Sequence, residues 1–532
     1  MAFFAASNCF RPFADNPLAL PTRRSIECSR GLFLNYIMAL DQGTSSSRAI
    51  IYDAIGQVVT VAQTDIDLFF PADGWVEQDP EQLWQSILTV GRQAIAQSGL
   101  AADAIKAIGI TNQRETTLLW ARASGVCEHN ALVWQDRRGV AHCQQMAEDT
   151  LADGRPVAQA ISDITGLIID PYFSSTKLAW LLDHVSGARE AANAGQLCFG
   201  TVDSFLLWKL SKGQSHVTDA TNASRTQLFD INEQVWSQEL LDYFDIPQAL
   251  LPQVLDSAAN FAVADSEWFG APIPVTGVAG DQQAALIGQA CFTSGMSKST
   301  YGTGCFAMTN TGAERPHSKQ RLLTTVAYRI AGQTCYALEG SIFVAGAAIK
   351  WLRDQLNLID NAAETQSAFE RCQGDSQGVF VVPAFTGLGA PYWQPDARGL
   401  ITGLTLDSSR DHVITATLQS VVLQTADLMR AMAGDGAGVK TLRVDGGMVV
   451  NDVLCQFLAD ILDVQVQRPN DVETTAKGAA VLAALGCGQL ADLQDAASAW
   501  QLDRTFTAQM STTRRQQLLD GYARAVAQAL SG

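Results

Sequence analysis

The sequence predicts an α/β protein built from two similar halves. Expected helices and strands alternate: residues 81–97 have helical spacing of apolar residues, 107–111 are strand-like and 176–184 are helical again. A strand, a turn containing Gly and Thr, and a second strand occur near residue 43 and again near residue 303. Because these units are far apart, we expect each half to open with a hairpin that faces a shared ligand.

Size and composition exclude several classes of protein. The chain has 532 residues, of which 47% are hydrophobic and 17% charged, so it can form more than one core. Its net charge of −18 disfavours a nucleic-acid partner. It contains no run of 18 apolar residues, so we expect no membrane span. The 11 cysteines include no C-x-x-C pair, which indicates reduced thiols and a cytoplasmic location rather than a zinc site.

The N-terminal segment differs from the rest of the chain. Residues 1–31 contain four arginines and only two acidic residues. We interpret 1–35 as a disordered N-terminal extension. An organelle transit peptide is the alternative, whereas a secretory signal would carry its basic residues earlier.

The first strands form a three-stranded meander with a polar turn. Strands are expected at 36–40, 48–52 and 57–61, and small hydroxyl residues follow Asp41 in the first turn. Backbone N–H groups of such a turn can face phosphate oxygens, Asp41 could hold hydrated magnesium, and Arg48 could meet phosphate charge. The alternative is an ordinary polar hairpin that ends in an aspartate.

Polar pairs follow the next strands. Arg114 and Glu115 place a donor fork beside an acceptor, which suits vicinal hydroxyl groups, although a solvated turn would look the same. Trp134, Tyr172 and Phe306 could wall the carbons of a small polyol, or could be core aromatics.

Asp281 stands where a strand becomes a helix. The strand at 273–278 leads through Gly280 into Asp281, which is placed either to cap the helix or to accept a hydroxyl proton. We place the domain boundary at this junction, which gives domains 36–284 and 285–532.

The second half contains two further glycine turns. Gly302, Thr303 and Gly304 could supply N–H donors from the opposite side of a nucleotide, or form an ordinary tight turn. Strand 441–445 ends in two glycines before helix 451–462, an arrangement that lets the backbone approach phosphate but is also common turn chemistry. The chain has neither a G-x-x-x-x-G-K-[ST] loop nor a G-x-G-x-x-G turn, which disfavours P-loop and Rossmann enzymes.

Taken together, the motifs resemble the FGGY carbohydrate kinases. The matching runs keep the family order over about residues 36–530: ALDQGT at 39–44, IGITNQRET at 108–116, DPYF at 170–173, GDQQAA at 280–285, YGTGCF at 301–306, FTGLGAPYW at 385–393 and RVDGG at 443–447. The resemblance implies two actin/hexokinase/Hsp70-like (ribonuclease H-like) α/β domains with an active-site cleft between them.

The resemblance also implies a role for each site residue. The ATP side comprises Thr44, Ser45 and Ser46 at the phosphates, Arg48 as a positive charge, Thr303 from the second domain, Gly346, Gly447 and Asn451 beside the nucleotide, and Asp41 as the residue that positions Mg²⁺. The acceptor side comprises Arg114, Glu115, Trp134, Tyr172, Asp281, Gln282 and Phe306, with Asp281 as catalytic base.

The implied reaction is ATP-dependent phosphorylation of glycerol to sn-glycerol 3-phosphate, the entry step of glycerol catabolism. Glycerol and ATP are then the partners, and the family suggests a homo-oligomer, either dimer or tetramer. Two alternatives stay open: a kinase for another polyol or ketose such as xylulose, and a non-catalytic actin-like ATP-binding protein.

Overall fold

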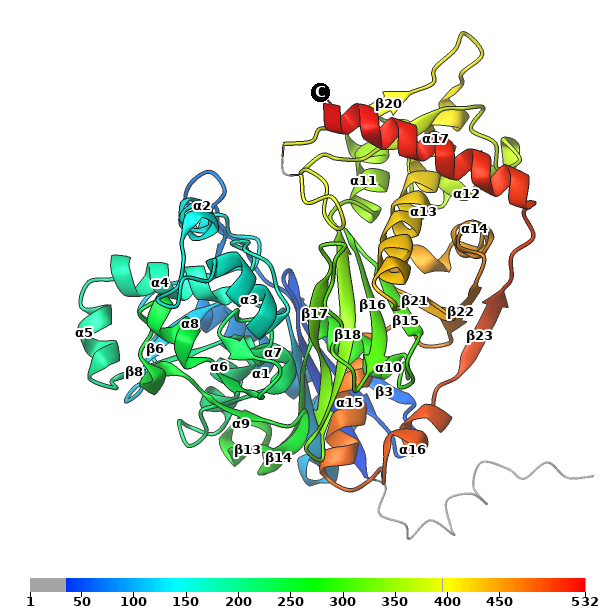
Figure 1. The fold of residues 1–532 in the computed structure, drawn as a ribbon. Coiled ribbons are helices and arrows are strands. Elements are labelled where there is room, and N and C mark those ends of the chain that lie inside the picture. Colours follow the sequence, from blue (N-terminus) through cyan, green and yellow to red (C-terminus); the bar gives the residue numbers. More distant parts are fainter. Residues whose placement is uncertain (1–34, 395, 532) are drawn as a thin grey trace, which may run out of the picture.

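The computed structural model describes residues 35–394 and 396–531 and shows two lobes, each built around a β-sheet (Figure 1). The extension predicted for 1–35 lies, apart from its last residue, outside the described part of the chain. No helix in the described ranges is long and apolar enough to cross a membrane. The nine described cysteines are free.

The first sheet has six strands in the order β13-β14-β5-β1-β2-β3. Strands β1 to β3 form the predicted antiparallel meander, and β5 and β14 continue the sheet in parallel with β1. The central strands are buried, which explains their nearly continuous apolar sequence. The bounds are β1 (Tyr36–Gln42), β2 (Ser46–Tyr52), β3 (Val58–Asp65), β5 (Ile105–Asn112), β13 (Ala258–Ala264) and β14 (Ile273–Gly280).

The second sheet repeats this pattern. Its order is β17-β18-β16-β15-β21-β22-β23, with an antiparallel β15–β16 hairpin, two parallel neighbours and an antiparallel edge strand. Strand β18 takes the place of β3, and β17 is an additional edge strand. The bounds are β15 (Met296–Tyr301), β16 (Cys305–Gly312), β17 (Leu323–Ile330), β18 (Gln333–Ile342), β21 (Thr441–Asp445), β22 (Gln465–Pro469) and β23 (Leu502–Phe506). The prediction of two hairpin-led α/β halves is therefore confirmed.

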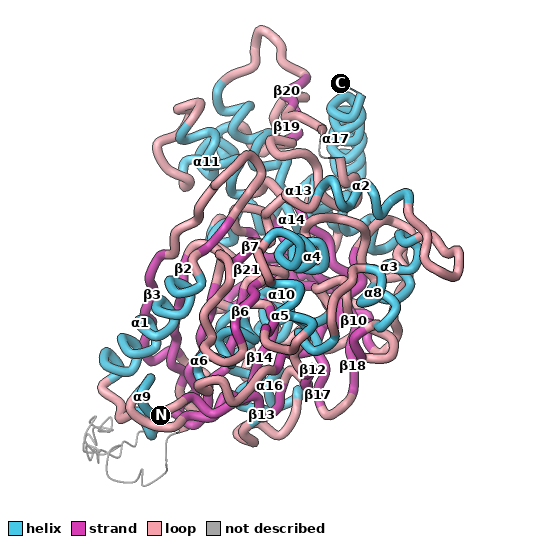
Figure 2. The backbone as a smooth tube through the Cα atoms, turned by 90° about the vertical axis from the view of Figure 1, so that its left-hand side faces the viewer, coloured by secondary structure: helices cyan, strands magenta, loops and turns pink. Residues whose placement is uncertain are grey.

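Helices surround both sheets, and the view in Figure 2 shows the first-lobe helices α3, α4 and α8 in front of the strands. The first lobe contains α1 (Pro80–Ser98), α2 (Val140–Glu148), α3 (Val157–Thr165), α4 (Ser174–His184), α5 (Ala188–Asn193), α6 (Val202–Leu210), α7 (Ala220–Ala223), α8 (Gln238–Tyr243), α9 (Ser266–Phe269) and α10 (Asp281–Gly288). The later helices are α11 (Gly346–Asp354), α12 (Glu364–Arg371), α13 (Arg410–Gly434), α14 (Asp452–Leu462), α15 (Thr474–Gly486), α16 (Leu493–Ser498) and α17 (Thr512–Ser531).

Short two-stranded ladders complete the fold. They are β4 (Glu77–Gln78) with β7 (Ala131–Leu132), β6 (Leu118–Ala121) with β8 (Leu197–Gly200), β9 (Val217–Asp219) with β12 (Gln253–Leu255), β10 (Phe229–Asp230) with β11 (Val235–Trp236), and β19 (Phe380–Val382) with β20 (Leu400–Thr402).

Helix α15 lies between β22 and β23 of the second sheet in sequence but packs on the first sheet and on α10. Glycines in the strands allow this close approach. A Cβ at Gly109 would lie 2.0 Å from the carbonyl oxygen of Ala479, and one at Gly277 would lie 2.3 Å from the backbone nitrogen of Ala483. The two halves are thus joined by backbone-to-backbone packing that larger residues would prevent.

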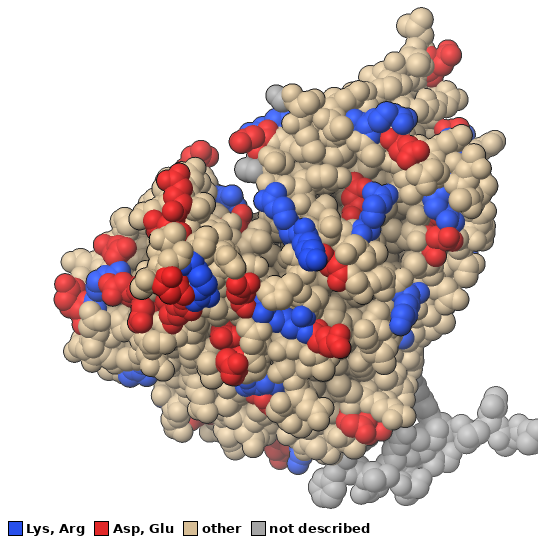
Figure 3. Space-filling model, in the orientation of Figure 1, with Lys and Arg blue, Asp and Glu red and all other residues tan. Residues whose placement is uncertain are grey.

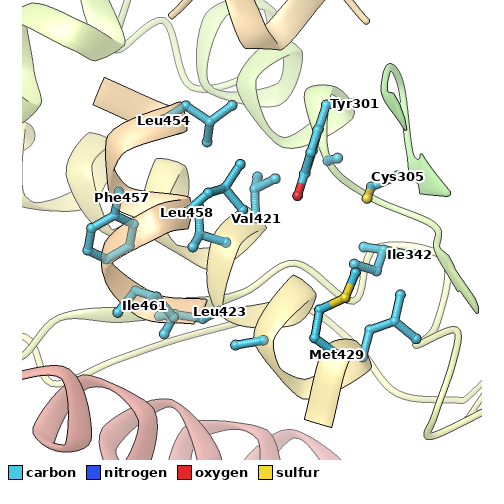
Figure 4. Close-up of a cluster of buried hydrophobic side chains, with 14 of the residues drawn as sticks. Tyr301, Cys305, Ile342, Val421, Leu423, Met429, Leu454, Phe457, Leu458 and Ile461 are labelled. Atoms are coloured by element: carbon cyan, nitrogen blue, oxygen red, sulfur yellow. The ribbon is translucent and has the colours of Figure 1, made fainter. Parts of the chain in front are cut away.

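Each lobe has its own hydrophobic core. In the second lobe, α13 and α14 pack their apolar faces against β15, with Val421, Leu458 and Tyr301 among the fully buried residues (Figure 4). In the first lobe, α1 and α6 bury Trp84, Ile87 and Phe205 against the sheet. Figure 3 shows the surface indented between the lobes at the top of the view, with acidic side chains gathered on the first lobe.

Candidate active site

The turn between β1 and β2 is held in a fixed shape. The Gly43 N–H donates to the Ser46 carbonyl at 2.9 Å, and the Thr44 carbonyl accepts from Gln78 Nε2 at 2.7 Å. Trp134 Nε1 donates to the Thr44 hydroxyl at 2.9 Å. Ser45 is exposed at the tip of the turn. A rigid turn with open backbone at its tip can receive an anion without reorganising.

Asp41 and Arg48 are opposite each other on β1 and β2. Burial raises the pKa of Asp41 to about 7; Arg48 opposes this shift, while the carboxylates of Asp281 and Glu473 add to it. Arg48 forms an ion pair with Glu473, which comes from the second half of the chain just before α15. The sequence did not predict this contact.

The surroundings of Asp41 fit a hydrated cation. Among the described residues, its carboxylate accepts no hydrogen bond, and the negative charges of Asp281 and Glu473 act on it, which favours a positive ligand. The described ranges contain no group of three or more His, Cys, Asp or Glu that could enclose a metal. A single carboxylate is enough for Mg²⁺, which keeps most of its waters.

The glycine turns of the second sheet lie together. Backbone N–H groups of Gly346 and Ala345 donate to the carbonyls of Gly302 and Thr303 at 3.0 and 2.9 Å. A Cβ at Gly346 would lie 2.5 Å from the Gly302 carbonyl oxygen and 3.5 Å from the Met448 sulfur. The start of α11, the 302–304 turn and the 447–450 turn therefore form one backbone-lined surface.

Asn451 lies at the edge of this surface and caps a helix. Its side chain accepts from the Leu454 N–H at 3.2 Å and donates to the Thr365 hydroxyl at 3.3 Å. A short 3₁₀ turn, Gly447–Val450, separates Gly447 from α14, where the sequence suggested a direct turn into the helix. Gly447 and Thr303 are both exposed.

Arg114 is the centre of a buried ionic network. Its Nη1 and Nη2 atoms donate to both carboxylate oxygens of Glu339 at 2.6 and 2.8 Å. Its Nε atom lies 3.1 Å from Asp281 Oδ1, and its Nη2 atom is 3.5 Å from the Tyr172 hydroxyl. The side chain of Asp281 is 32% exposed, whereas those of Arg114 and Glu339 are 2% and 0% exposed. The network therefore reaches solvent through Asp281.

Glu115 is fixed beside Arg114 in a strained conformation. Its φ is 59°, in the left-handed region that non-glycine residues seldom adopt. Arg225 Nε donates to its carboxylate at 2.7 Å. Burial raises the pKa of Glu115, and the charges of Arg225 and Arg114 oppose that effect. The strain points to a residue held for function rather than for stability.

Asp281 is the first residue of α10, as its sequence position suggested. Its Oδ1 atom accepts the Gln282 N–H at 2.7 Å. Gln282 is held by the buried Lys298, whose ammonium group donates to Gln282 Oε1 and, at 3.0 Å, to the Thr300 hydroxyl. Residues of both sheets therefore fix the start of this helix.

The three aromatic side chains that were predicted to wall a polyol contact one another. The Trp134 ring meets the edges of Tyr172 and Phe306 at centroid distances of 5.6 and 6.4 Å. Tyr172 is positioned by Lys177, whose buried ammonium donates to the carbonyls of residues 171 to 173. Because Trp134 also donates to Thr44, the three aromatic residues are connected to the turn between β1 and β2.

Four residues of the site were missed by the sequence analysis: Arg225, Lys298, Glu339 and Glu473. Glu339 left a signal, since it is a lone acid in the apolar strand β18. The structure brings predicted residues together around Arg114, and Trp134 contacts both Tyr172 of that group and Thr44 of the first hairpin turn.

Comparison with protein families identifies the chain. Residues 36–288 match the N-terminal domain model of the FGGY family of carbohydrate kinases, and residues 298–487 match its C-terminal domain model. The chain belongs to the FGGY family of carbohydrate kinases. Both FGGY domain models thus fall on the two sheets described above, and the fold prediction is confirmed.

Several FGGY relatives are similar over nearly their whole length. A "Glycerol kinase 1" of Pseudomonas aeruginosa is 57% identical over 92% of this chain and 98% of its own. Proteins named glycerol kinase from Alteromonas mediterranea and Coxiella burnetii are 54% and 50% identical, with 98% of each covered.

Solved structures agree on the FGGY fold. A Plasmodium falciparum glycerol kinase with ADP matches with a TM-score of 0.87 and 34% identity, over 93% of this chain and 98% of that one. A ligand-bound xylulose kinase from Lactobacillus acidophilus matches with a TM-score of 0.83 over 94% and 99% of the two chains, but at 21% identity this likeness concerns the fold alone.

Proposed function

We propose that this FGGY kinase transfers the γ-phosphoryl group of ATP to a terminal hydroxyl of glycerol, giving sn-glycerol 3-phosphate and ADP. The observation that carries the proposal is the network in which Arg114 forms an ion pair with the partly exposed Asp281 near the aromatic cluster of Trp134, Tyr172 and Phe306. The high identity to glycerol kinases over nearly the full chain supports this acceptor.

On the acceptor side, Arg114 and Glu115 bind hydroxyl groups of glycerol, with Tyr172 and Gln282 as further partners. Trp134 and Phe306 cover the carbon chain, because a three-carbon polyol has an apolar edge that hydrogen bonds cannot use. Asp281 is the catalytic base, since it is the solvent-accessible carboxylate of the network.

On the nucleotide side, Thr44, Ser45, Ser46 and Arg48 contact phosphate groups, and Thr303 contacts them from the second lobe. Gly346, Gly447 and Asn451 border the rest of the nucleotide. The transition state of phosphoryl transfer is loose, so alignment of the two substrates and stabilisation of negative charge give most of the acceleration. Arg48 must then leave or share its ion pair with Glu473 when phosphate arrives.

Asp41 positions Mg²⁺, which when bound neutralises phosphate charge. Two observations support this role: the pKa of Asp41 is raised, and no group among the described residues donates a hydrogen bond to its carboxylate. Bound cation would keep the carboxyl group ionised at neutral pH, because an adjacent positive charge lowers a carboxyl pKa.

The remaining assignments follow from the same model. We place the domains at 36–284 and 285–532, with the active-site cleft between them, and infer that closure excludes water from the γ-phosphate. We also propose a cytoplasmic homo-oligomer, either dimer or tetramer.

A coupled ADP-release assay with MgATP tests the function. The acceptors are glycerol, dihydroxyacetone, xylulose, ribulose and gluconate, each supplied to the purified full chain. We expect strong turnover with glycerol. Turnover only with a ketose would refute the acceptor assignment, and no turnover with any acceptor would favour a non-catalytic ATP-binding protein.

A further inference from the structure

We propose that Glu339 is a positioning residue for the acceptor site: it clamps Arg114 so that one edge of the guanidinium meets Asp281 and one N–H stays free for a substrate hydroxyl. This inference rests on the proposed function, in which Arg114 binds glycerol and Asp281 is the base. Glu339 itself does not contact the acceptor, because its side chain is completely buried.

Glu339 comes from the other sheet. It lies in the middle of β18, whereas Arg114 follows β5 of the first sheet, so the second half of the chain supplies a residue behind the acceptor site. Both carboxylate oxygens bind Arg114, at 2.6 and 2.8 Å, in the two-pronged geometry that fixes the rotation of a guanidinium. One oxygen also accepts from Arg225 at 3.3 Å.

Counting donors shows what the clamp leaves free. Arg114 has five N–H groups. The Nε atom is ion-paired with Asp281 Oδ1 at 3.1 Å. Nη1 donates to Glu339 and, at 3.2 Å, to Gln283 Oε1, and one N–H of Nη2 donates to Glu339. Within the described part of the chain, the last N–H has only the Tyr172 hydroxyl as a partner, at 3.5 Å, which is too long for a strong bond. That N–H is available for a substrate hydroxyl beside Tyr172.

Charge balance gives Glu339 a second effect. The cations Arg114, Arg225 and Lys298 face the carboxylates of Glu115, Glu339 and the partly exposed Asp281, so the charges of the network balance only while Glu339 is ionised. Burial acts to raise the pKa of Glu339, but Arg114 and Arg225 outweigh it and lower the pKa to about 2, so the carboxylate is ionised at neutral pH. Without it, Arg114 would be drawn toward Asp281 and away from the acceptor.

The test compares Glu339→Gln and Glu339→Asp in the full chain by steady-state kinetics. We expect E339Q to lower kcat/KM for glycerol by about 100-fold, the cost typical of a 1 Å misplacement, while KM for ATP changes less than twofold. E339D keeps the charge, but its side chain is one methylene shorter, so kcat/KM for glycerol should fall by about 10-fold. Asp427→Asn is the matched control, because Asp427 is also a buried acid, paired with Arg430 in α13, and should leave both constants within twofold.

A double-mutant cycle separates positioning from a structural role. If Glu339 acts through Arg114, E339Q should lower kcat/KM for glycerol by less than threefold when Arg114 has already been replaced by Lys. The inference would be overturned if the losses of kcat/KM in the two single variants multiplied fully in the double variant. It would also be overturned if E339Q raised KM for ATP as much as KM for glycerol, or if E339D had wild-type kinetics. If the wild type phosphorylates only another acceptor, the proposed function is wrong and the same cycle, run with that acceptor, still tests Glu339.

Discussion

The two sheets share one strand arrangement but place different chemistry at equivalent positions. In the first hairpin Asp41 is paired with Arg48 across the turn, and at the matching place in the second hairpin Thr300 is paired with Phe306. At this position the first hairpin thus presents two charged side chains, and the second hairpin presents two neutral ones. The shared strand arrangement determines the position of each hairpin turn, and the side chains beside the turn determine which ligand groups it can bind.

The sharpest test of this asymmetry is Asp281→Asn. The variant keeps the shape of the side chain but cannot accept a proton, so kcat should fall by about 10³ while MgATP binding, followed by calorimetry, is preserved. Asp452→Asn is the matched control, because Asp452 is likewise the first residue of a helix, α14, in the second half. The Asp452→Asn variant should lose only surface ion pairs and keep kcat within twofold. An equal fall in kcat in the two variants would refute the role of Asp281.

Packing on the two sheets also differs, and Gly109→Ala tests that difference. The strand β5 needs glycine under α15, whereas the equivalent β21 carries Leu442 and Val444. The added methyl group would collide with a helix backbone, so we expect the free energy of unfolding to fall by about 3 kcal/mol in urea titrations. Gly438→Ala, which meets no atom within 4 Å, should change it little. A G109A protein as stable as the wild type would show that α15 does not need this approach.

The two hairpins and the strands β5, β14 and β21 could be predicted from the sequence because apolar alternation and turn residues are local signals, whereas β13, β17, β18, β22 and β23 were not predicted. The site was predictable where motifs are contiguous, as at residues 108–116 and 301–306. Glu339 and Glu473 were not, since their partners Arg114 and Arg48 are 225 and 425 residues away. Only the packing of the second half against the first brings these charges together.

The ion pair between Glu339 and Arg114, which joins the two sheets, should also make stability depend on pH under acidic conditions. Because the pKa of Glu339 is lowered from its ordinary value of 4.5 to about 2 in the folded protein, its contribution to stability is complete above pH 4.5 and is lost as the pH falls toward 2. The stability difference between the wild type and E339Q should therefore narrow over that window, as measured by urea unfolding at successive pH values. If the difference in stability between the wild type and E339Q stayed constant with pH, the ion pair of Glu339 would not be its cause.

The smallest expected effect concerns the other contact between the halves. Glu473→Gln removes the carboxylate that competes with phosphate for Arg48, so KM for MgATP should fall about threefold with KM for glycerol unchanged. Glu239→Gln, a half-exposed acid paired with Arg155 far along the first lobe, is the control and should change neither. A rise in KM for MgATP would mean that Glu473 helps Arg48 instead of competing with it.

A crystal structure with glycerol, Mg²⁺ and a non-hydrolysable ATP analogue would test the shared site most directly. We predict one glycerol hydroxyl within about 3 Å of both Asp281 and the γ-phosphate, a second bonded to Arg114, and phosphate oxygens contacting both the 44–46 turn and Thr303. Glycerol bound away from Arg114, or phosphates held by one hairpin alone, would contradict a site assembled from both halves.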